Sequence, residues 1–206
     1  MSTSDAAPWT TTTHDWSTRV DLAHLDTIRR APDTYAPGGL LHLILEVIAY
    51  ADDEARDLGR PGTCVVTLHA DGSVSVTDDG RGTDTRLDSS GVAIKKPVMA
   101  TKDLRFFDPP HDVLLPDGQP RRGMSVVSAL SLWLLHTNRR HDGAWTQRYD
   151  HGVPASDLIP VGTTPQTGTT VSFLVDHTLV PEASATPDKL RELARFPWTS
   201  VHVTTG

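Results

Sequence analysis

The chain has 206 residues, with 26 acidic and 19 basic side chains and a net charge of -7, and its pI is about 5.7. This length suffices for one well-buried α/β core, and the acidic balance argues against direct DNA binding, which relies on clustered Lys and Arg. The single cysteine, Cys64, excludes an internal disulfide, and the absence of a signal peptide or an apolar run of ~20 residues predicts a cytoplasmic protein without a membrane span.

The amino-terminal region predicts an arm followed by one domain. Residues 1–18 are polar and rich in threonine, with Trp9 and Trp16 as large aromatic groups. Such a terminus predicts a flexible arm. Residues 19–206 are expected to form the domain, and within it Asp21–Arg30 shows a short helical pattern that ends before a proline-containing turn.

The stretch Leu40–Leu58 predicts the helix around which the rest of the chain is organised. Its apolar residues recur at helical spacing and place one stripe against a core. They are Leu41, Ile44, Leu45, Ile48, Ala51 and Ala55. Glu46, Tyr50 and Asp53 form a neighbouring stripe, with Glu54 beside them. Carboxylates at the edge of an apolar stripe lie between core and solvent, where helices commonly contact ligands; a solvated acidic face is the alternative.

A β-hairpin is predicted directly after this helix. Cys64–Leu68 and Ser73–Thr77 have the residue types of strands, and Asp71-Gly72 between them is a signal for a tight turn. The second strand continues into Asp78–Gly82, with the sequence DDGRG. Two glycines around an arginine suit a turn where the backbone closely approaches a bound group. An ordinary turn is the alternative.

The rest of the chain alternates loops with shorter elements. We predict, in order, a short helix formed by residues 92–94 and 98–99, a proline-rich loop at Lys102–Gly123, a buried amphipathic helix at Met124–Leu135, strands at Trp145–Tyr149 and Thr170–Leu174, a helix at Pro187–Arg195 capped by Thr186, and a final strand at Trp198–Val203. His42, on the central helix, is predicted to be a packing residue.

The helix and the hairpin together carry a family resemblance. The segments LEVIAYADDEA and VSVTDDGRG resemble the ATP-binding domain of the DNA gyrase B subunit and its type II topoisomerase relatives, which belong to the GHKL superfamily and share the Bergerat fold. Four further segments occur in the family's order: IRRAPDTY, RRGMSVVSALS, YDHGVP and TGTTVSF. The resemblance covers roughly Asp26–Leu174. It implies an α+β fold, a two-layer sandwich with a mixed, mostly antiparallel sheet covered by helices on one face, and no transducer or DNA-cleaving domain is expected in a chain of this length.

The resemblance implies roles for several side chains. In the family, a glutamate on the central helix activates the water that attacks the γ-phosphate, and Glu46 has that position. Asp78 matches the aspartate that binds the adenine amino group, and Thr169 matches the threonine that supports it. Glu54 matches the partner of the DDGRG arginine, which is Arg81 here.

The sequence departs from the family at the phosphate end of the pocket. Tyr50 replaces the asparagine that holds Mg²⁺, and a neutral phenol is a poor ligand for that cation. Of the glycine-rich GLHGVG segment that binds phosphates, only Gly123 remains, so the backbone cradle is expected to be lost. Arg121 and Arg122 precede it, and either could bind an anion. An arginine usual on the strand before DHGVP is missing, with Arg148 nearby on the same face of that strand.

These observations favour a repurposed pocket that has lost ATP hydrolysis and binds a hydrophobic small molecule, without a cofactor or a metal. We expect such a protein to act in natural-product biosynthesis, for example by cyclising its ligand, or in self-resistance. The candidate catalytic residues are Glu46, Tyr50 and Asp78. The candidate ligand-binding residues are Asp78, Arg81, Gly82, Thr169, Ile48, Phe106 and Arg148.

Two alternatives keep the nucleotide. The chain could be an ATP-binding module with Mg²⁺ and weak or no hydrolysis, for example a regulator of gyrase, or a working ATPase with a displaced metal site. In all three cases we expect a monomer or a weak homodimer with no DNA or membrane partner.

Overall fold

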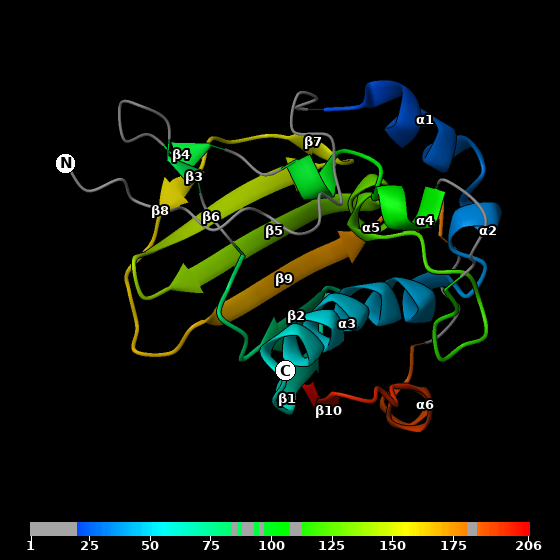
Figure 1. Ribbon diagram of the computed structural model, residues 1–206. Helices are drawn as coiled ribbons and strands as arrows, with labels where there is room; N and C mark the ends of the chain where they lie inside the picture. Colours follow the sequence, from blue (N-terminus) through cyan, green and yellow to red (C-terminus); the bar gives the residue numbers. More distant parts are fainter. Residues whose placement is uncertain (1–19, 84–85, 88–92, 95–96, 108–112, 181–184) are drawn as a thin grey trace.

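The computed structural model describes residues 20–83, 86–87, 93–94, 97–107, 113–180 and 185–206. The predicted arm at residues 1–18 lies outside this part of the chain. Figure 1 shows one large sheet with helices gathered against it. No helix within these ranges combines the length and the apolar character needed to cross a membrane.

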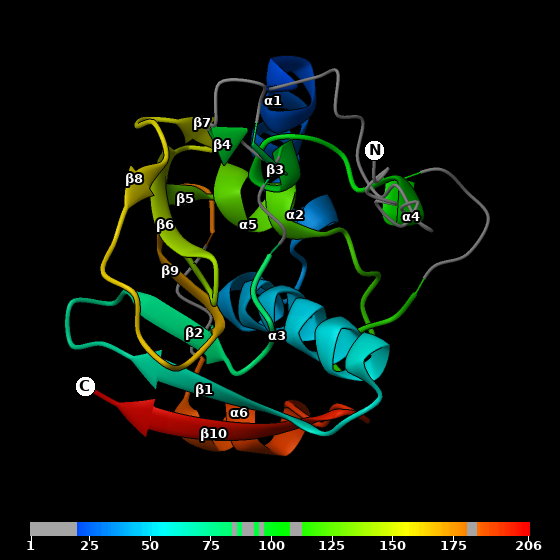
Figure 2. The ribbon, with the colours of Figure 1, turned by 60° about the vertical axis from the view of Figure 1, so that its left-hand side comes forward.

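The large sheet has eight strands in the order β10, β1, β2, β9, β5, β6 and β7, with β8 also paired to β6. Figure 2 shows β10 and β1 at one edge and the short strands β7 and β8 at the other. The strands are β1 (Gly62–Leu68), β2 (Val74–Asp78), β5 (Ser131–Arg140), β6 (Gly143–Asp150), β7 (Val153–Pro154), β8 (Ile159–Pro160), β9 (Gly168–Val175) and β10 (Thr199–Thr205). Among the described strands β1 and β10 pair in parallel and the remaining pairs are antiparallel. The predicted mixed, mostly antiparallel sheet is confirmed.

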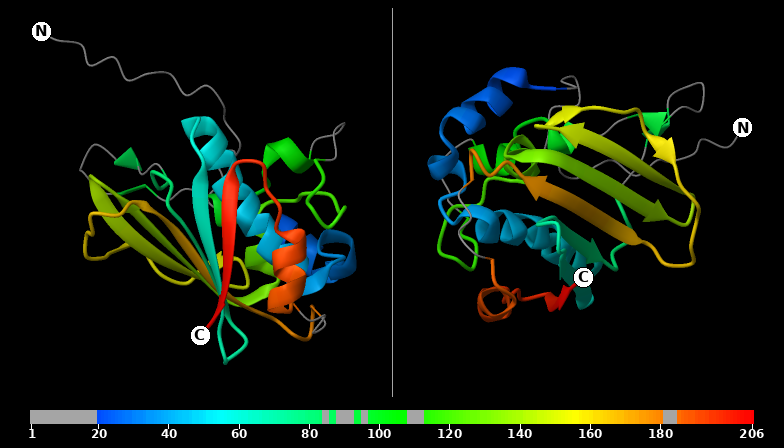
Figure 3. Two further views of the ribbon diagram at one scale, coloured as in Figure 1. Left: turned by 90° about the horizontal axis from the view of Figure 1, so that it is seen from below. Right: turned by 180° about the vertical axis from the view of Figure 1, so that it is seen from behind.

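The helices lie on one side of this sheet, as the edge-on view in Figure 3 shows. They are α1 (Leu22–Arg30), α2 (Pro32–Tyr35), α3 (Gly39–Leu58), α4 (Leu104–Phe107), α5 (Met124–Ala129) and α6 (Pro187–Leu193), with a 3-10 helix at Pro97–Met99. The predicted cap of the last helix is confirmed, because the side chain of Thr186 accepts a hydrogen bond from the backbone N–H of Lys189. The fold is therefore the α+β arrangement that the sequence predicts.

The predicted central helix is confirmed as α3. Ile44, Leu45 and Ile48 are fully buried, because their spacing places them on the predicted apolar stripe of the helix. Leu43, outside that stripe, is also fully buried, because this part of α3 is covered on its other sides as well. They share one hydrophobic core with strand residues such as Phe173. Truncating a core leucine of this kind to alanine typically costs about 2–5 kcal/mol of unfolding free energy. This burial fixes the position of the polar side chains along the neighbouring stripe of α3.

The predicted helix at Met124–Leu135 is wrong in its second half. Helix α5 ends at Ala129 and strand β5 begins at Ser131, with a β-bulge between Ser131 and Trp133. The run VVSALSLWLL is apolar almost throughout, and such a run fits a buried helix and a buried strand equally well. The strand forms because its backbone groups pair with β6 on one side and β9 on the other.

Two smaller predictions in the middle of the chain also need correction. Ala93–Ile94 forms strand β4, paired with β3 (Arg86–Leu87), and Pro97–Met99 forms the 3-10 helix, so these residues are not one helix. Val92, which the same prediction included, lies outside the described residues. The proline-rich loop contains the short helix α4. The predicted hairpin and the later strands are confirmed as β1, β2, β6, β9 and β10.

Candidate functional site

The carboxylate of Asp78 lies at the end of β2, beside the start of β9. Its Oδ1 accepts hydrogen bonds from the backbone N–H groups of Gly80 (2.8 Å) and Thr169 (3.2 Å). Asp78 is half-buried, and its Oδ2 has no hydrogen-bond partner among the described residues. Burial raises the pKa of Asp78 to about 6, although the two backbone hydrogen bonds lower it. The side chain is thus anchored by one oxygen and can accept a hydrogen bond through the other.

The DDGRG turn is fixed against α3 and β5. Glu54 on α3 accepts hydrogen bonds from Nε (2.8 Å) and Nη2 (3.2 Å) of Arg81. Gly82 has a φ of 79° and packs so closely on β5 that a Cβ there would lie 2.5 Å from a carbonyl oxygen, which explains why glycine is needed at this position. Asn138 on β5 bonds both the N–H and the C=O of Thr83, each at 2.7 Å. These contacts give the Asp78 end of the site a rigid wall.

Glu46 is fully buried beneath the start of α5. Its Oε2 accepts a hydrogen bond from the backbone N–H of Gly123 at 2.9 Å, and its Oε1 accepts one from the backbone N–H of Arg122. The carboxylate therefore occupies two backbone donors that would otherwise be free to bind an anion. Both oxygens of this buried carboxylate are thus bonded to the backbone of the protein itself.

His42 lies one turn before Glu46 on α3 and is also fully buried. Its Nε2 lies 3.5 Å from Oε1 of Glu46, and its Nδ1 lies 2.7 Å from Oδ2 of Asp117. Burial lowers the pKa of His42, but the hydrogen bonds and charges of the two carboxylates outweigh it and raise the pKa to about 9. His42 is buried as a packing residue would be, and it is also the cationic centre of an ionic network, which the sequence prediction omitted.

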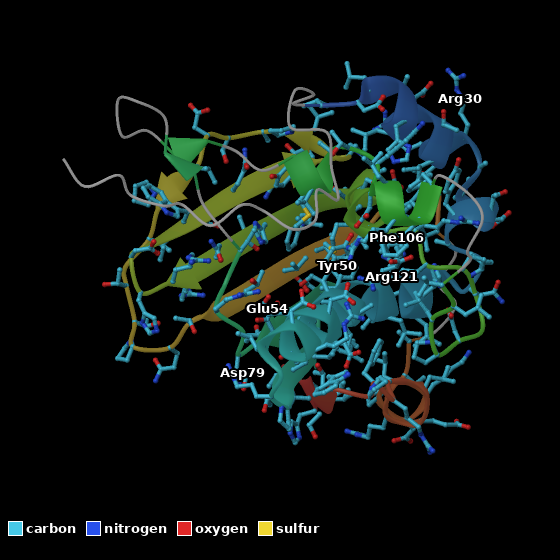
Figure 4. The ribbon with its side chains drawn as sticks, in the orientation of Figure 1. Arg30, Tyr50, Glu54, Asp79, Phe106 and Arg121 are labelled. Carbon is cyan, nitrogen blue, oxygen red and sulfur yellow. The ribbon has the colours of Figure 1, made fainter. Side chains whose placement is uncertain are left out.

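Tyr50 lies near the middle of a cluster of aromatic and charged side chains above α3 (Figure 4). Its hydroxyl donates a hydrogen bond to Oδ2 of Asp103 at 2.6 Å. The guanidinium carbons of Arg105 and Arg121 lie 5.4 and 4.7 Å from the centre of the Tyr50 ring, and 4.8 and 4.6 Å from that of Phe106. Burial and the charge of Asp103 raise the pKa of Tyr50 well above its usual value, so the phenol stays neutral.

Asp53 joins the arginines of this group. Its Oδ2 lies 3.0 Å from Nη1 of Arg105 and 2.9 Å from Nη2 of Arg121, and its Oδ1 lies 3.1 Å from Nη2 of Arg56. Asp103 binds the other two nitrogens of Arg105, at 3.0 Å for Nε and 2.7 Å for Nη2. We call this group the Tyr50 cluster; it comprises Tyr50, Asp53, Asp103, Arg105, Phe106 and Arg121.

The segment 113–123 lies along α3 and connects these features. It forms a tight loop closed by the bridge between Leu114 and Pro120. It contacts three positions that follow one another along α3. The pairs are Asp117 with His42, Gly123 with Glu46, and Arg121 with Asp53. The segment that carries the family's phosphate-binding glycine is thus fastened to the helix by the protein's own side chains.

Comparison with known proteins decides the family. The chain is 37% identical over 171 residues to the DNA gyrase B subunit of Mycolicibacterium smegmatis, a match that covers 81% of this chain and 24% of that protein. It is 32% identical over 160 residues to the DNA topoisomerase 4 B subunit of Staphylococcus epidermidis, covering 75% and 24%, and 33% identical over 182 residues to the DNA gyrase B subunit of Thermotoga maritima, covering 84% and 28%. No family model matches.

The chain belongs to the family of the gyrase B and topoisomerase IV B subunits, as a homologue of their GHKL ATPase domain. The resemblance drawn from the six motifs is therefore confirmed. The chain spans 24 to 28% of the length of these relatives.

The predicted site residues of this gyrase B homologue fall into two groups. Asp78, Arg81, Gly82 and Thr169 come together at the end of β2 and β9. Glu46, Tyr50 and Phe106 lie at the other end, next to the segment 113–123. Ile48 lies between Glu46 and Tyr50 on α3 and is fully buried in the hydrophobic core.

The structure does not bring Arg148 to either group. Successive residues of a strand point to opposite faces of a sheet, and the neighbouring Tyr149 packs into the core beside α3. Arg148 therefore points to the opposite face, where it is exposed, pairs with Asp150 at 2.9 Å and lies 5.6 Å from the centre of the Trp133 ring. The alternation of a strand correctly places Arg148 on the same face as Thr146. It does not reveal whether that face is turned toward the helices or away from them.

Several site residues could not be recognised in the sequence. Asp103, Arg105 and Asp117 lie in the proline-rich loop, where no periodicity indicates what they contact. Asp103 had one usable signal, since its Oδ1 accepts the backbone N–H of Arg105 at 3.1 Å and so caps α4. Asn138 lies just beyond the segment that was predicted as a helix and that forms a strand, so its contact with the DDGRG turn could not be anticipated.

The Tyr50 end does not fit a magnesium–triphosphate group. Mg²⁺ prefers carboxylate, carbonyl and water oxygens in octahedral geometry, and here the phenol of Tyr50 takes the place of an amide and is bonded to Asp103. Both oxygens of Glu46 already accept backbone N–H groups. Within the described ranges, no group of three or more His, Cys, Asp and Glu side chains is arranged to hold a metal ion.

Proposed function

We propose that this gyrase B homologue binds a compact, largely apolar small molecule through Asp78 and does not hydrolyse ATP. The observation that carries the proposal is the Asp78 carboxylate, whose Oδ1 is held by two backbone N–H groups while its Oδ2 has no partner among the described residues. An amide, pyrrole or hydroxyl donor of the ligand would complete it. A hydrogen bond to a charged acceptor of this kind contributes about 1.5–3 kcal/mol.

The surroundings of Glu46 support the loss of hydrolysis. Positioning and charge neutralisation are nearly the whole of phosphoryl-transfer catalysis, and losing one such element costs on the order of 10³-fold in rate. Here the position of the catalytic glutamate is buried and engaged by Arg122 and Gly123, and the position of the metal ligand is a tyrosine bonded to Asp103. Both departures act on the same step.

The role we propose for such binding is in natural-product biosynthesis or self-resistance. A protein of this kind would sequester a compound that targets the gyrase pocket, or would hold a flexible precursor in a conformation ready to cyclise, an effect that needs orientation only. Of the three candidate catalytic side chains, Asp78 is the one that keeps an oxygen without a described protein partner. The orienting role therefore falls to Asp78.

An adenine-binding module without hydrolysis is the second candidate. It is favoured by the Asp78 end, where the backbone N–H of Thr169 donates to Asp78 and Glu54 pairs with Arg81 as the family resemblance implies. In this case the base would bind and the triphosphate would gain little from the Tyr50 end.

Calorimetric titration with adenosine, with ATP plus Mg²⁺ and with a panel of apolar gyrase-directed natural products and their linear precursors tests the proposal. The variants are Asp78→Asn and, as a matched control on the adjacent residue, Asp79→Asn. Asp79 also accepts a backbone hydrogen bond through Oδ1, from Thr63 at 2.8 Å, and Asn keeps that acceptor.

We expect an apolar compound to bind wild type and Asp79→Asn equally, and Asp78→Asn roughly ten- to 150-fold more weakly. Binding that survives unchanged in Asp78→Asn would contradict the proposed site. Adenosine as the only ligand that binds would favour the adenine module. ATP turnover that is abolished by Glu46→Ala would sink the proposal that hydrolysis is lost.

A further inference from the structure

Arg121 is a buried cation whose hydrogen-bonding capacity is almost unused. Its side chain is 6% exposed, and neither Nε nor Nη2 has a hydrogen-bond partner among the described residues. The ionic contact of its Nη2 with Asp53, at 2.9 Å, lacks hydrogen-bond geometry. A guanidinium has five N–H donors and cannot lose its charge. Leaving a buried charged donor without a hydrogen-bond acceptor is unfavourable, so the guanidinium of Arg121 would gain from binding an additional acceptor.

The neighbouring Arg105 shows what a purely structural arginine looks like in the same cluster. All three of its nitrogens are engaged, Nε and Nη2 by Asp103 and Nη1 by Asp53. Both arginines lie against the same Tyr50 and Phe106 rings. The rings hold the plane of Arg121 in place while supplying no acceptor for its N–H groups.

Asp53 makes Arg121 the exchangeable member of the cluster. Its carboxylate is shared among Arg56, Arg105 and Arg121. If another anion takes Arg121, Asp53 keeps two cationic partners and is not left as a lone buried charge. Arg105 could not be released in the same way, because Asp103 is fully buried and has a bidentate contact with it.

We propose that Arg121 binds an oxyanion of the ligand, a carboxylate or a monophosphate, at the end of the site remote from Asp78. This inference rests on the proposed function, and it adds that the ligand is an acid with a hydrogen-bond donor at its other end. A planar fork of N–H groups suits the two oxygens of such an anion, and a lysine would not replace it. Arg121 thus supplies the positive charge that a metal ion would otherwise supply to a phosphate at this end of the site.

Two matched pairs of probes test this inference. The first pair is 6-amino-2-naphthoate and its neutral amide, and the second is AMP and adenosine; both pairs offer an amino group to Asp78. Affinities are measured by calorimetry on wild type, Arg121→Gln and Arg56→Gln. Arg56 is the matched control, because it also pairs with Asp53 but its side chain is 54% exposed.

We expect the acid of at least one pair to bind wild type and Arg56→Gln about ten- to 150-fold more tightly than its neutral partner, and this preference to disappear in Arg121→Gln. A preference in the first pair identifies a carboxylate, and one in the second identifies a phosphate. Equal binding within both pairs, or no binding of either acid at millimolar concentration, overturns the inference.

Two further measurements keep the result interpretable. Asp78→Asn should weaken the binding of both members of a pair to the same extent. If it does not, while Arg121→Gln still abolishes the preference for the acid, the proposed function is contradicted and the role of Arg121 is not. If Arg121→Gln melts below the assay temperature, Arg121→Lys replaces it. We expect Arg121→Lys to keep the charge but to lose most of the preference for the acid, since it lacks the fork.

Discussion

Tyr50 donates its hydroxyl hydrogen to Asp103 over 2.6 Å, and this bond ties α3 to the start of α4. Asp103 is fully buried and also accepts the backbone N–H and the guanidinium of Arg105. Tyr50, which replaces a metal-binding asparagine of the family, is thus part of an internal network. The guanidinium groups of Arg105 and Arg121 lie over its ring.

Replacing Tyr50 by Phe should destabilise the protein. The change removes one hydrogen bond to a charged, buried acceptor, so we expect a loss of about 1.5–3 kcal/mol in the free energy of unfolding, measured by urea denaturation. Tyr35→Phe is the control, because the hydroxyl of Tyr35 has no hydrogen-bond partner among the described residues. A loss in Tyr50→Phe no larger than in the control would show that the bond contributes nothing net.

Replacing Tyr50 by Asn should not create ATPase activity. The variant restores the family's residue type, but the oxygens of Glu46 remain engaged by Arg122 and Gly123. A phosphate-release assay with Mg²⁺ is expected to show no turnover above background for wild type and for the variant. Hydrolysis in Tyr50→Asn would mean that the segment 113–123 opens readily and that Glu46 is available.

Glu46→Gln should destabilise the fold much more than a surface change would. The amide group of Gln turns one acceptor into a donor facing a backbone N–H, and the buried His42 loses a counter-charge. We expect a loss of roughly 3 kcal/mol in urea denaturation. In Glu54→Gln, where the side chain is 24% exposed and pairs with an exposed arginine, the loss should stay below about 1 kcal/mol. Equal losses would contradict the view that Glu46 is a structural anion.

The stability of the protein should fall as the pH rises through the pKa of His42. The folded state raises this pKa from 6.5 to about 9, so folding favours the protonated form. The contribution is fully present below pH 6.5 and is lost as the pH rises through 9, with a total of about 3 kcal/mol. Urea denaturation of wild type at pH 6.5 and pH 9.5 should show the loss, and His42→Gln should show a smaller one. A pH profile identical in the two proteins would refute the assignment.

Asp78 should lower the stability of the protein with rising pH as His42 does, but at a lower pH, and replacing it should stabilise the protein. Its folded pKa, about 6, lies above the ordinary 3.8, so the folded protein binds this proton more tightly than the unfolded chain does. Ionisation of Asp78 therefore lowers the free energy of unfolding as the pH rises from about 4 through 6. We expect Asp78→Asn to be more stable than wild type by about 1–2 kcal/mol at pH 8, discounting for partial exposure, and no more stable at pH 4. A ligand that needs the carboxylate should bind wild type more weakly below pH 6.

The elements with strong periodicity could be predicted from the sequence alone. Helix α3 has an unbroken apolar stripe, and the hairpin has alternating strands around Asp71-Gly72, so local pattern and final structure agree. The boundary between α5 and β5 could not be predicted, because a continuous apolar run has no period. Sheet pairing on both sides of β5 decided it.

The two ends of the site differ in the same way. At the Asp78 end, Asp78 and Arg81 lie within one turn and were recognised from a single motif, although Thr169 joins them from β9. The Tyr50 cluster joins residues of α3 to residues more than fifty positions later in an irregular loop. Family resemblance could say that Tyr50 departs from the expected asparagine, but only the structure shows that Asp103 receives its hydrogen.

The segment 113–123 is fastened to α3 at three separate points. Because Asp117, Arg121 and Gly123 each meet a different residue of the helix, inserting or deleting one residue between Asp117 and Arg121 would shift the later contacts out of register. The loop therefore has a fixed length, unlike an ordinary surface loop that tolerates insertions. The backbone amides of Arg122 and Gly123, which donate to the buried Glu46, should therefore exchange with solvent much more slowly than those of an ordinary surface loop.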